Sequence, residues 1–298
     1  MAVRKGVDYT LLRIIAYVVV SLAAAVCLLP FLMLISSSFT EESEIVKNGF
    51  SLLPLKFTLG AYEFAFRIPG RILSAYMVTI TVTAVGTVVS LFFVSMAGYV
   101  LQRRDFRYRN RISFIIYFAQ LFSVGLIPQY ILVTKFLGLT DNLLALILPP
   151  LLSPFLVILM RTFIRTAVPD SIVESAKIDG ANDFLIYRKL ILPLSTAGLA
   201  TIGLFTALTY WNDWFQGSLY IRTANKYPLQ FYLYNLLMSA QAMREMANVA
   251  MSSSAGGLIP QESFKMATAI VVTGPILLLY PFVQKYFVTG LTIGAVKG

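Results

Sequence analysis

The sequence predicts an all-α integral membrane protein with six transmembrane helices, and three observations lead to this fold class. Of the 298 residues, 58% are hydrophobic and only 13% are charged, which is about half the charged fraction of a typical soluble domain. The apolar residues are grouped in long blocks, and blocks of about 18 or more are typical of membrane-spanning helices. Helix is the expected form, because backbone polar groups in lipid must be satisfied within their own segment.

Six apolar segments are each long enough to cross a hydrocarbon layer about 30 Å thick. Their approximate bounds are 11–39, 72–101, 112–136, 143–163, 194–215 and 264–288. The first follows Arg4 and Lys5 as a signal peptide would. It is too long for one and is followed by no small-residue cleavage site, so we expect a retained first span. Residues 1–298 are then expected to form a single transmembrane domain.

Basic residues in the short loops predict the orientation of these segments. Arginines crowd the loop 102–111, and arginines and lysines recur over 161–189, on the same side as the basic N-terminus. The loop 40–71 has mixed charge. Because Lys and Arg are enriched in cytoplasmic loops, both termini are expected to be cytoplasmic. This asymmetry also accounts for the net charge of +10 without nucleic-acid binding, which requires a soluble basic face.

The composition excludes several classes of activity. There are no histidines, and Cys27 is the single cysteine, so no metal site is predicted. The middle of each predicted span has almost no ionisable residue, which disfavours a stand-alone proton-coupled carrier and a membrane-embedded enzyme. The glycine-rich ATP-binding loop is missing from the sequence too. Any ATP-derived energy must therefore come from partners, and we expect no cofactor bound by this chain.

Small residues recur along the second segment, including Gly86 and Gly98. They predict close helix packing, which could lie within the chain or at an interface between subunits.

The loop 165–193, between the fourth and fifth segments, carries the strongest local signals. Pro169 suits the first turn of a helix, Gly180 suits the left-handed turn that ends one, and Asn182 suits a cap. Asp179 is a second candidate for that cap. We therefore expect two short helices joined at 179–180 and ending at Pro193. The first is half apolar, and it could dock on its own spans or in a groove of a partner.

This loop resembles the glutamate-alanine-alanine motif of ABC importer permeases. The matching positions are Glu174, Ala176, Asp179, Gly180, Ala181, Ile191, Leu192 and Pro193, with Ser175 as a mild departure. The resemblance extends over nearly the whole chain. It includes the segment 127–130, the turn 137–142, the aromatic run 210–215 and the tail 290–298. It is closest to the six-span permeases of carbohydrate importers of the maltose-system type, and especially to a Gram-positive oligosaccharide branch.

The resemblance implies a function and a set of partners. It implies a permease in the bacterial plasma membrane that translocates a sugar or oligosaccharide by alternating access. Its partners would be a second homologous permease, two cytoplasmic ATP-binding subunits that use ATP and Mg²⁺, and an extracytoplasmic solute-binding protein. The implied ATPase-coupling residues are Ile172, Glu174, Ala176, Ile178, Asp179, Gly180 and Ala181. Gly294, Lys297 and Gly298 would contact the ATPases, unless the tail is simply a frayed end.

Candidates for the solute pathway are polar or aromatic residues at or near span ends. They are Gln120, Gln129, Tyr130, Trp211, Asn212 and Asp213. For the aromatic side chains an interfacial belt is the simpler expectation, and a role in the solute pathway is the alternative. The long loop 216–263 should be extracytoplasmic, where it could contact the solute-binding protein or cover the helix bundle.

Overall fold

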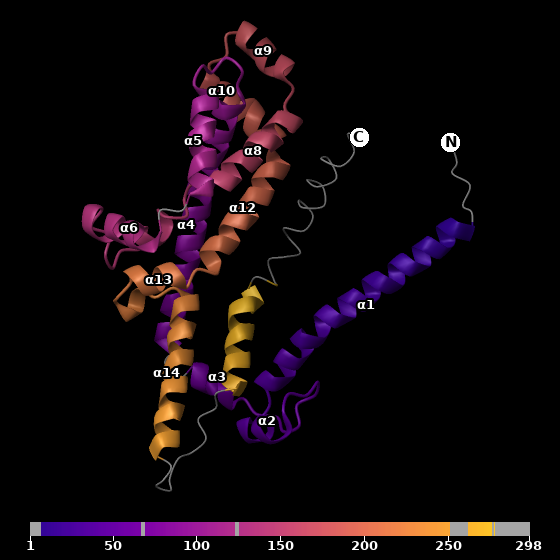
Figure 1. The fold of residues 1–298 in the computed structure, drawn as a ribbon, viewed down its shortest axis with the longest axis vertical. Coiled ribbons are helices and arrows are strands. Elements are labelled where there is room, and N and C mark those ends of the chain that lie inside the picture. Colours follow the sequence, from indigo (N-terminus) through magenta and orange to yellow (C-terminus); the bar gives the residue numbers. More distant parts are fainter. Residues whose placement is uncertain (1–6, 67–68, 123–124, 251–261, 276, 278–298) are drawn as a thin grey trace. The chain divides into compact units, whose positions relative to one another are not determined.

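The computed structural model describes residues 7–66, 69–122, 125–250, 262–275 and 277, and these are helical almost throughout (Figure 1). No β-strand occurs in these ranges, where Thr40 and Phe57 form an isolated β-bridge. The described residues pack into two units. One is drawn from 1–69 and 235–275, and the other from 70–234 and 276–298.

The first unit contains one of the two helices in the described ranges that are long and apolar enough to span a membrane alone. Its elements are α1 (Val7–Ser38), α2 (Glu42–Asn48), α3 (Gly60–Ala65), the later part of α14 (Leu229–Ala250) and a helix over 262–275. Within α1, Leu11–Ser38 contains an 18-residue stretch with a mean hydropathy of 2.8. Most of its large apolar side chains from Leu11 to Ile35 are exposed, as contact with lipid or with another subunit requires.

A buried carboxylate holds this unit together. Glu42 is 7% exposed, and it accepts hydrogen bonds from the backbone N–H groups of Glu262 and Ser263, each at 2.9 Å. The Ser263 hydroxyl donates a third bond at 2.9 Å. Glu42 therefore satisfies the free N–H groups at the start of the helix over 262–275.

The second unit contains the segments from which the candidate site is built. Its elements are α4 (Pro69–Gln102), α5 (Arg109–Leu121), α6 (Leu126–Ile131), the π-helical η1 (Leu132–Phe136), α7 (Leu144–Ile147), α8 (Pro154–Ala167), α9 (Asp170–Ile178), α10 (Asp183–Ile186), the π-helical η2 (Tyr187–Ile191), α11 (Leu192–Leu194), α12 (Thr196–Trp211), α13 (Phe215–Tyr220), the 3₁₀ turn η3 (Ala224–Lys226) and the start of α14. One apolar core joins α4, α8, η2 and α12, and Val94, Met160, Ile191 and Ile202 are fully buried in it.

Glycines allow α4 to pack closely on its neighbours. A Cβ atom added at Gly98 would lie 3.0 Å from Met160 Cγ and 3.1 Å from the backbone nitrogen of Arg161. One added at Gly86 would lie 2.5 Å from the ring of Tyr210. The close packing predicted for the second segment therefore occurs within the chain at these positions, against α8 and α12.

The helices match the predicted segments unequally. By length and composition, two helices of the described ranges could span a membrane alone, or up to four if each of two bent pairs counts as one span. The segment 112–136 is divided into α5 and α6–η1, whose axes differ in direction by 112°. The segment 143–163 is divided into α7 and α8, on either side of Pro149 and Pro150. The segment 264–288 is described only as far as 277.

Candidate functional site

The loop between α8 and α12 contains the two short helices that the sequence predicts. Pro169 is extended and directly precedes α9, which ends at Ile178 with Asp179 as its C-cap. Gly180 follows with a φ of +80°. The N–H groups of Gly180 and Ala181 donate to the carbonyls of Lys177 (3.0 Å) and Ala176 (2.9 Å). This pair of bonds is the Schellman arrangement that closes a helix with a left-handed residue, and it explains why glycine stands at 180.

The second short helix is capped by one side chain. Asn182 Oδ1 accepts a hydrogen bond of 2.8 Å from the backbone N–H of Leu185 at the start of α10. Asp179, the second candidate for this cap, instead occupies the C-terminal boundary of α9. After η2 and α11 the chain bends by 82° into α12, so the loop leads directly into an apolar helix.

The two faces of α9 have different surroundings. Val173 and Ala176 pack against the core of the second unit, together with Ala181 of the turn. Ile172 is 40% exposed and Ile178 is 86% exposed. Docking of α9 on its own spans and docking in a partner's groove are therefore compatible. One face of α9 packs on the chain's own bundle, and apolar residues outside that face remain exposed.

A network of charges attaches α9 and α10 to the loop that follows α4. We call Arg103, Asp105, Lys177 and Asp183 the charge clamp. Arg103 pairs with both Asp105 and Asp183, and Lys177 Nζ lies 2.6 Å from Asp105 Oδ2. Hydrogen bonds from Arg103 and then from Lys177 hold the pKa of Asp105 well below its usual range. The clamp joins Lys177 of α9 and Asp183 of α10 to the loop after α4. Lys177 lies 72 positions after its partner Asp105, and Asp183 lies 80 positions after its partner Arg103.

Further contacts strengthen this attachment. Asp170, the first residue of α9, accepts a hydrogen bond of 3.1 Å from Gln102 and pairs with Arg104 at 3.1 Å. The hydroxyls of Tyr187 in η2 and Ser95 in α4 lie 2.6 Å apart in a buried hydrogen bond. The segment 170–193 is thus held to the end of α4 by charged contacts on its surface and by a polar contact in the core.

Glu174, the motif's glutamate, is exposed on α9. Within the described ranges its carboxylate has no hydrogen bond or ion pair, since the nearby Arg103 and Arg104 pair with other acids. The role that the resemblance implies for Glu174 stays a prediction.

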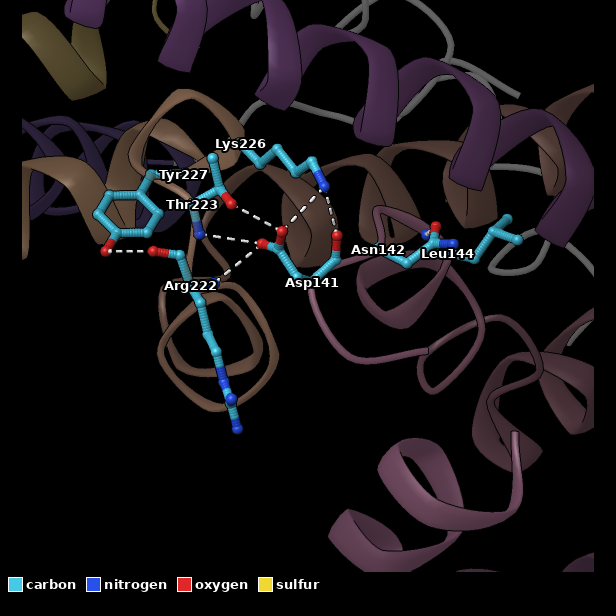
Figure 2. Close-up of polar contacts among 7 residues, drawn as sticks. All are labelled: Asp141, Asn142, Leu144, Arg222, Thr223, Lys226 and Tyr227. Atoms are coloured by element: carbon cyan, nitrogen blue, oxygen red, sulfur yellow. Dashed lines mark hydrogen bonds and ion pairs between the residues drawn. The ribbon is translucent and has the colours of Figure 1, made fainter. Parts of the chain in front are cut away.

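A second polar cluster surrounds Asp141, in the turn between η1 and α7 (Figure 2). Its Oδ1 accepts from the backbone N–H groups of Arg222 (3.1 Å) and Thr223 (3.0 Å). Its Oδ2 accepts from the Thr223 hydroxyl at 2.7 Å and from Lys226 Nζ at 2.9 Å. The bonds from Thr223, followed by those from Lys226 and Arg222, lower the pKa of Asp141 well below its usual range. This Asp141 turn joins two loops 82 residues apart, with Asp141 itself at a φ of 58°.

The structure brings together only some of the predicted pathway residues. Tyr130 is half-buried and stacks on Tyr220, with ring centroids 6.0 Å apart. Gln129 is half-buried beside Tyr130, whereas Gln120 lies exposed on α5. Trp211 is buried, with 7% of its surface exposed, at the end of α12. Asp213 accepts a hydrogen bond of 2.9 Å from the backbone N–H of Gln216, so it links α12 to α13.

Asn212 lies on a groove that sequence reasoning did not identify. The groove encloses about 760 Å³ between the segment 149–156 and α12. Asn212 Oδ1 also accepts a hydrogen bond of 3.2 Å from Gln230. Besides Asn212, the polar side chains on the groove are Ser153, Thr206 and Thr209 among proline and aromatic neighbours. Small hydroxyl residues in an apolar segment give no sequence signal that separates a groove lining from helix packing. The tail residues Gly294, Lys297 and Gly298 lie outside the described residues.

Known proteins share both the sequence and the fold of this chain. The family model described as "binding-protein-dependent transport system inner membrane component" matches residues 93–293. The polygalacturonan/rhamnogalacturonan transport system permease protein YtcP of Bacillus subtilis is 41% identical, over 92% of this chain and 94% of the relative. The arabinooligosaccharides permease AraQ of Halalkalibacterium halodurans is 28% identical, over 92% and 93%.

A solved structure supports the same assignment. It is a bacterial ABC transporter involved in the import of the acidic polysaccharide alginate. Its matching chain has a TM-score of 0.79 and 30% identity, with 95% of this chain and 98% of that chain covered.

These matches confirm the resemblance drawn from the loop motif and decide among the classes of protein. The family consists of membrane transport components, so the chain is a transport subunit and neither an enzyme nor a stand-alone carrier. Transport of this kind requires ATP-hydrolysing and solute-binding partners. The chain belongs to the family of inner membrane components of binding-protein-dependent transport systems, as a permease subunit of an ABC importer.

Proposed function

We propose that this permease passes a sugar or oligosaccharide across the bacterial plasma membrane by alternating access. A solute-binding protein delivers the solute outside. Two ATPase subunits drive the cycle, and a second homologous permease completes the pathway. The observation that carries the proposal is the segment 170–193, which is closely attached to α4 and α12 but leaves apolar side chains uncovered at its tip.

In this proposal, α9 and the turn after it form the joint with one ATPase. Ile172 and Ile178 enter an apolar groove of the ATPase, and the free carboxylate of Glu174 meets a cation there. Ala176 and Ala181 hold the joint to the core, while Asp179 and Gly180 shape its turn. Because the charge clamp and the Tyr187–Ser95 bond tie this joint to α4, its displacement would move the membrane helices. The tail residues Gly294, Lys297 and Gly298 form a second ATPase contact, supported by the family resemblance alone.

The topology proposed is one transmembrane domain of six spans with both termini in the cytoplasm. α1 and α4 are single spans, and α5 with α6–η1 makes a broken one. The remaining three spans are α7 together with α8, then α12, and then the segment that begins with the helix over 262–275. The basic loops 102–111 and 161–189 support a cytoplasmic location for the clamp and α9.

The proposed solute follows from the relatives and from the groove. The related systems named above carry polygalacturonan or rhamnogalacturonan, arabinooligosaccharides and alginate. The groove at Asn212 offers hydroxyl and amide groups beside Phe155 and Phe205, a combination that suits the polar edges and apolar faces of sugar rings. The chain itself binds no cofactor in this proposal, because ATP and Mg²⁺ are held by the ATPases.

The test is purification of the tagged chain from membranes, followed by an ATPase assay with candidate oligosaccharides and their binding protein. We expect two ATPase copies and a second permease to co-purify, with hydrolysis stimulated by the loaded binding protein. Ile178→Glu should lose the ATPases, whereas Ile178→Leu should keep them. ATPases that remain bound to Ile178→Glu would refute the proposed joint, and stimulation by non-carbohydrate solutes alone would refute the proposed solute class.

A further inference from the structure

A polar cavity lies beside the charge clamp, and it is not part of the proposed contact with the ATPase. It encloses about 450 Å³ between the end of α4, the start of α5 and the end of α8. Its charged lining consists of four arginines, Arg104, Arg109, Arg161 and Arg165, and one acid, Asp170. We call it the arginine pocket. The acid is already engaged by Arg104 and Gln102.

Three of the four arginines therefore have no carboxylate partner within the described ranges. Arg161 donates to the Ser113 hydroxyl at 3.3 Å, and Arg109 donates to the carbonyl of Arg103 at 3.5 Å. Both acceptors are neutral, and Arg165 is exposed and makes no side-chain hydrogen bond or ion pair within the described ranges. Converging guanidinium groups repel one another unless an anion lies between them, and their planar geometry matches the oxygens of a phosphate.

We propose that the arginine pocket binds the phosphate group of an anionic phospholipid from the cytoplasmic leaflet. This inference rests on the orientation proposed above. The pocket is lined by the end of α4, the start of α5 and the end of α8, which in the proposed orientation is the side of the cytoplasmic lipid head groups. Further along α5, Phe114 and Ile115 are 68% and 63% exposed and Phe118 is 50% exposed, so an apolar surface for acyl chains follows the pocket. Basic pockets between membrane helices on the cytoplasmic side are suited to such head groups.

The site has a clear experimental signature. The full importer complex would be placed in nanodiscs of phosphatidylcholine with labelled phosphatidylglycerol, and the labelled lipid retained after extraction would be counted by native mass spectrometry. Arg109→Gln and Arg165→Gln should each lower the affinity for labelled lipid about fivefold. Arg107→Gln is the matched control, because Arg107 is an exposed arginine of the same loop outside the pocket. It should retain the native amount.

Further arms distinguish the source of the phosphate and guard against misfolding. Arg165→Lys keeps the charge and should retain more lipid than Arg165→Gln. Excess inorganic phosphate should not displace the lipid. Displacement by phosphate would overturn the lipid assignment in favour of a soluble anion. Equal losses in Arg107→Gln, or no loss in the pocket variants, would overturn the site itself.

One more outcome bears on the partner subunits. If labelled lipid binds only after the ATPases are stripped away, an acidic group of the ATPase occupies the pocket and the proposal is wrong. Because lipid retention is measured without solute uptake, an incorrect solute class would leave this result unchanged.

Discussion

The charge clamp and the Asp141 turn perform the same task in two different ways. Asp105 and Asp141 each join loops that are far apart in sequence. Among the described residues, Asp105 binds the side chains of Arg103 and Lys177, whereas Asp141 binds two backbone N–H groups as well as Lys226. Long side chains can reorient, but a backbone held by a carboxylate cannot shift without losing its bonds. The comparison indicates that the charge clamp is the more adjustable attachment and the Asp141 turn the more rigid one, while both hold their loops together.

The largest expected effect comes from Gly180→Val. A β-branched residue at a φ of +80° is strained by about 1–3 kcal/mol, and relief of this strain would open the Schellman turn. We expect a roughly tenfold or greater loss of solute-stimulated ATPase activity with normal membrane insertion. Gly49→Val imposes at least as much strain, at a φ of +76° and a ψ of −167° in the first unit, and should keep coupling. Equal losses in both variants would mean that strain anywhere disrupts the complex.

The next effect tests the Asp141 turn. Asp141→Ala removes four side-chain hydrogen bonds, and the loop that contains Arg222 and Lys226 should loosen. Both residues are trypsin sites, so we expect cleavage there to become severalfold faster in membranes that expose this loop. Asp141→Asn keeps one acceptor and tolerates a positive φ, and it should be intermediate. An unchanged cleavage rate in Asp141→Ala would show that other contacts hold the loop.

A smaller effect is expected at the clamp. Asp105 is 50% exposed, and exposed ion pairs contribute about 0.2–1 kcal/mol each. Asp105→Asn should therefore lower stimulated ATPase activity about two- to fivefold. Raising the salt concentration should lower activity in the native protein and have less effect in the variant. Glu63→Gln, which removes an exposed acid of the first unit, serves as the control and should leave both measurements unchanged.

The smallest effect concerns pH. The folded pKa of Asp105 is depressed by Arg103 and Lys177. Its stabilising contribution is therefore complete above the unfolded pKa of about 4 and is lost only as the pH falls through the lower folded pKa. Asp141 has the same sign. We expect trypsin cleavage near Arg222 to be constant between about pH 6 and about pH 8 once corrected for the protease's own activity. A loss of protection within that window would refute the carboxylate assignment.

The sequence predicted local features better than contacts between distant residues. The turn at Gly180 and the cap at Asn182 depend on residues a few positions apart, so their chemistry is visible in the loop itself. α1 and α4 lie close to their predicted bounds because a long apolar run in lipid has few alternatives to helix. The family assignment rested on the same local spacing in the loop.

The remaining features depend on tertiary packing. The arginines of the loop 102–111 predict the orientation of the spans. The contact that attaches α9 to this loop depends instead on Asp105, which forms ion pairs with Arg103 and Lys177. No spacing rule pairs residues 72 positions apart. The sequence also predicts continuous spans over 112–136 and 143–163, where the structure has breaks. Proline and glycine in membrane helices are compatible with either a kink or a full break. Neighbouring helices decide between the two.

The carboxylate of Glu42 has a consequence for the order in which the protein is made. Its backbone partner Ser263 follows 221 residues later. Glu42 therefore has no helix start to cap until nearly the whole chain has left the ribosome. During synthesis it must stay hydrated or be held by the insertion machinery, because an unpaired buried carboxylate is costly. The first unit therefore closes late, and a nascent chain stopped before residue 262 lacks the groups that pair with Glu42.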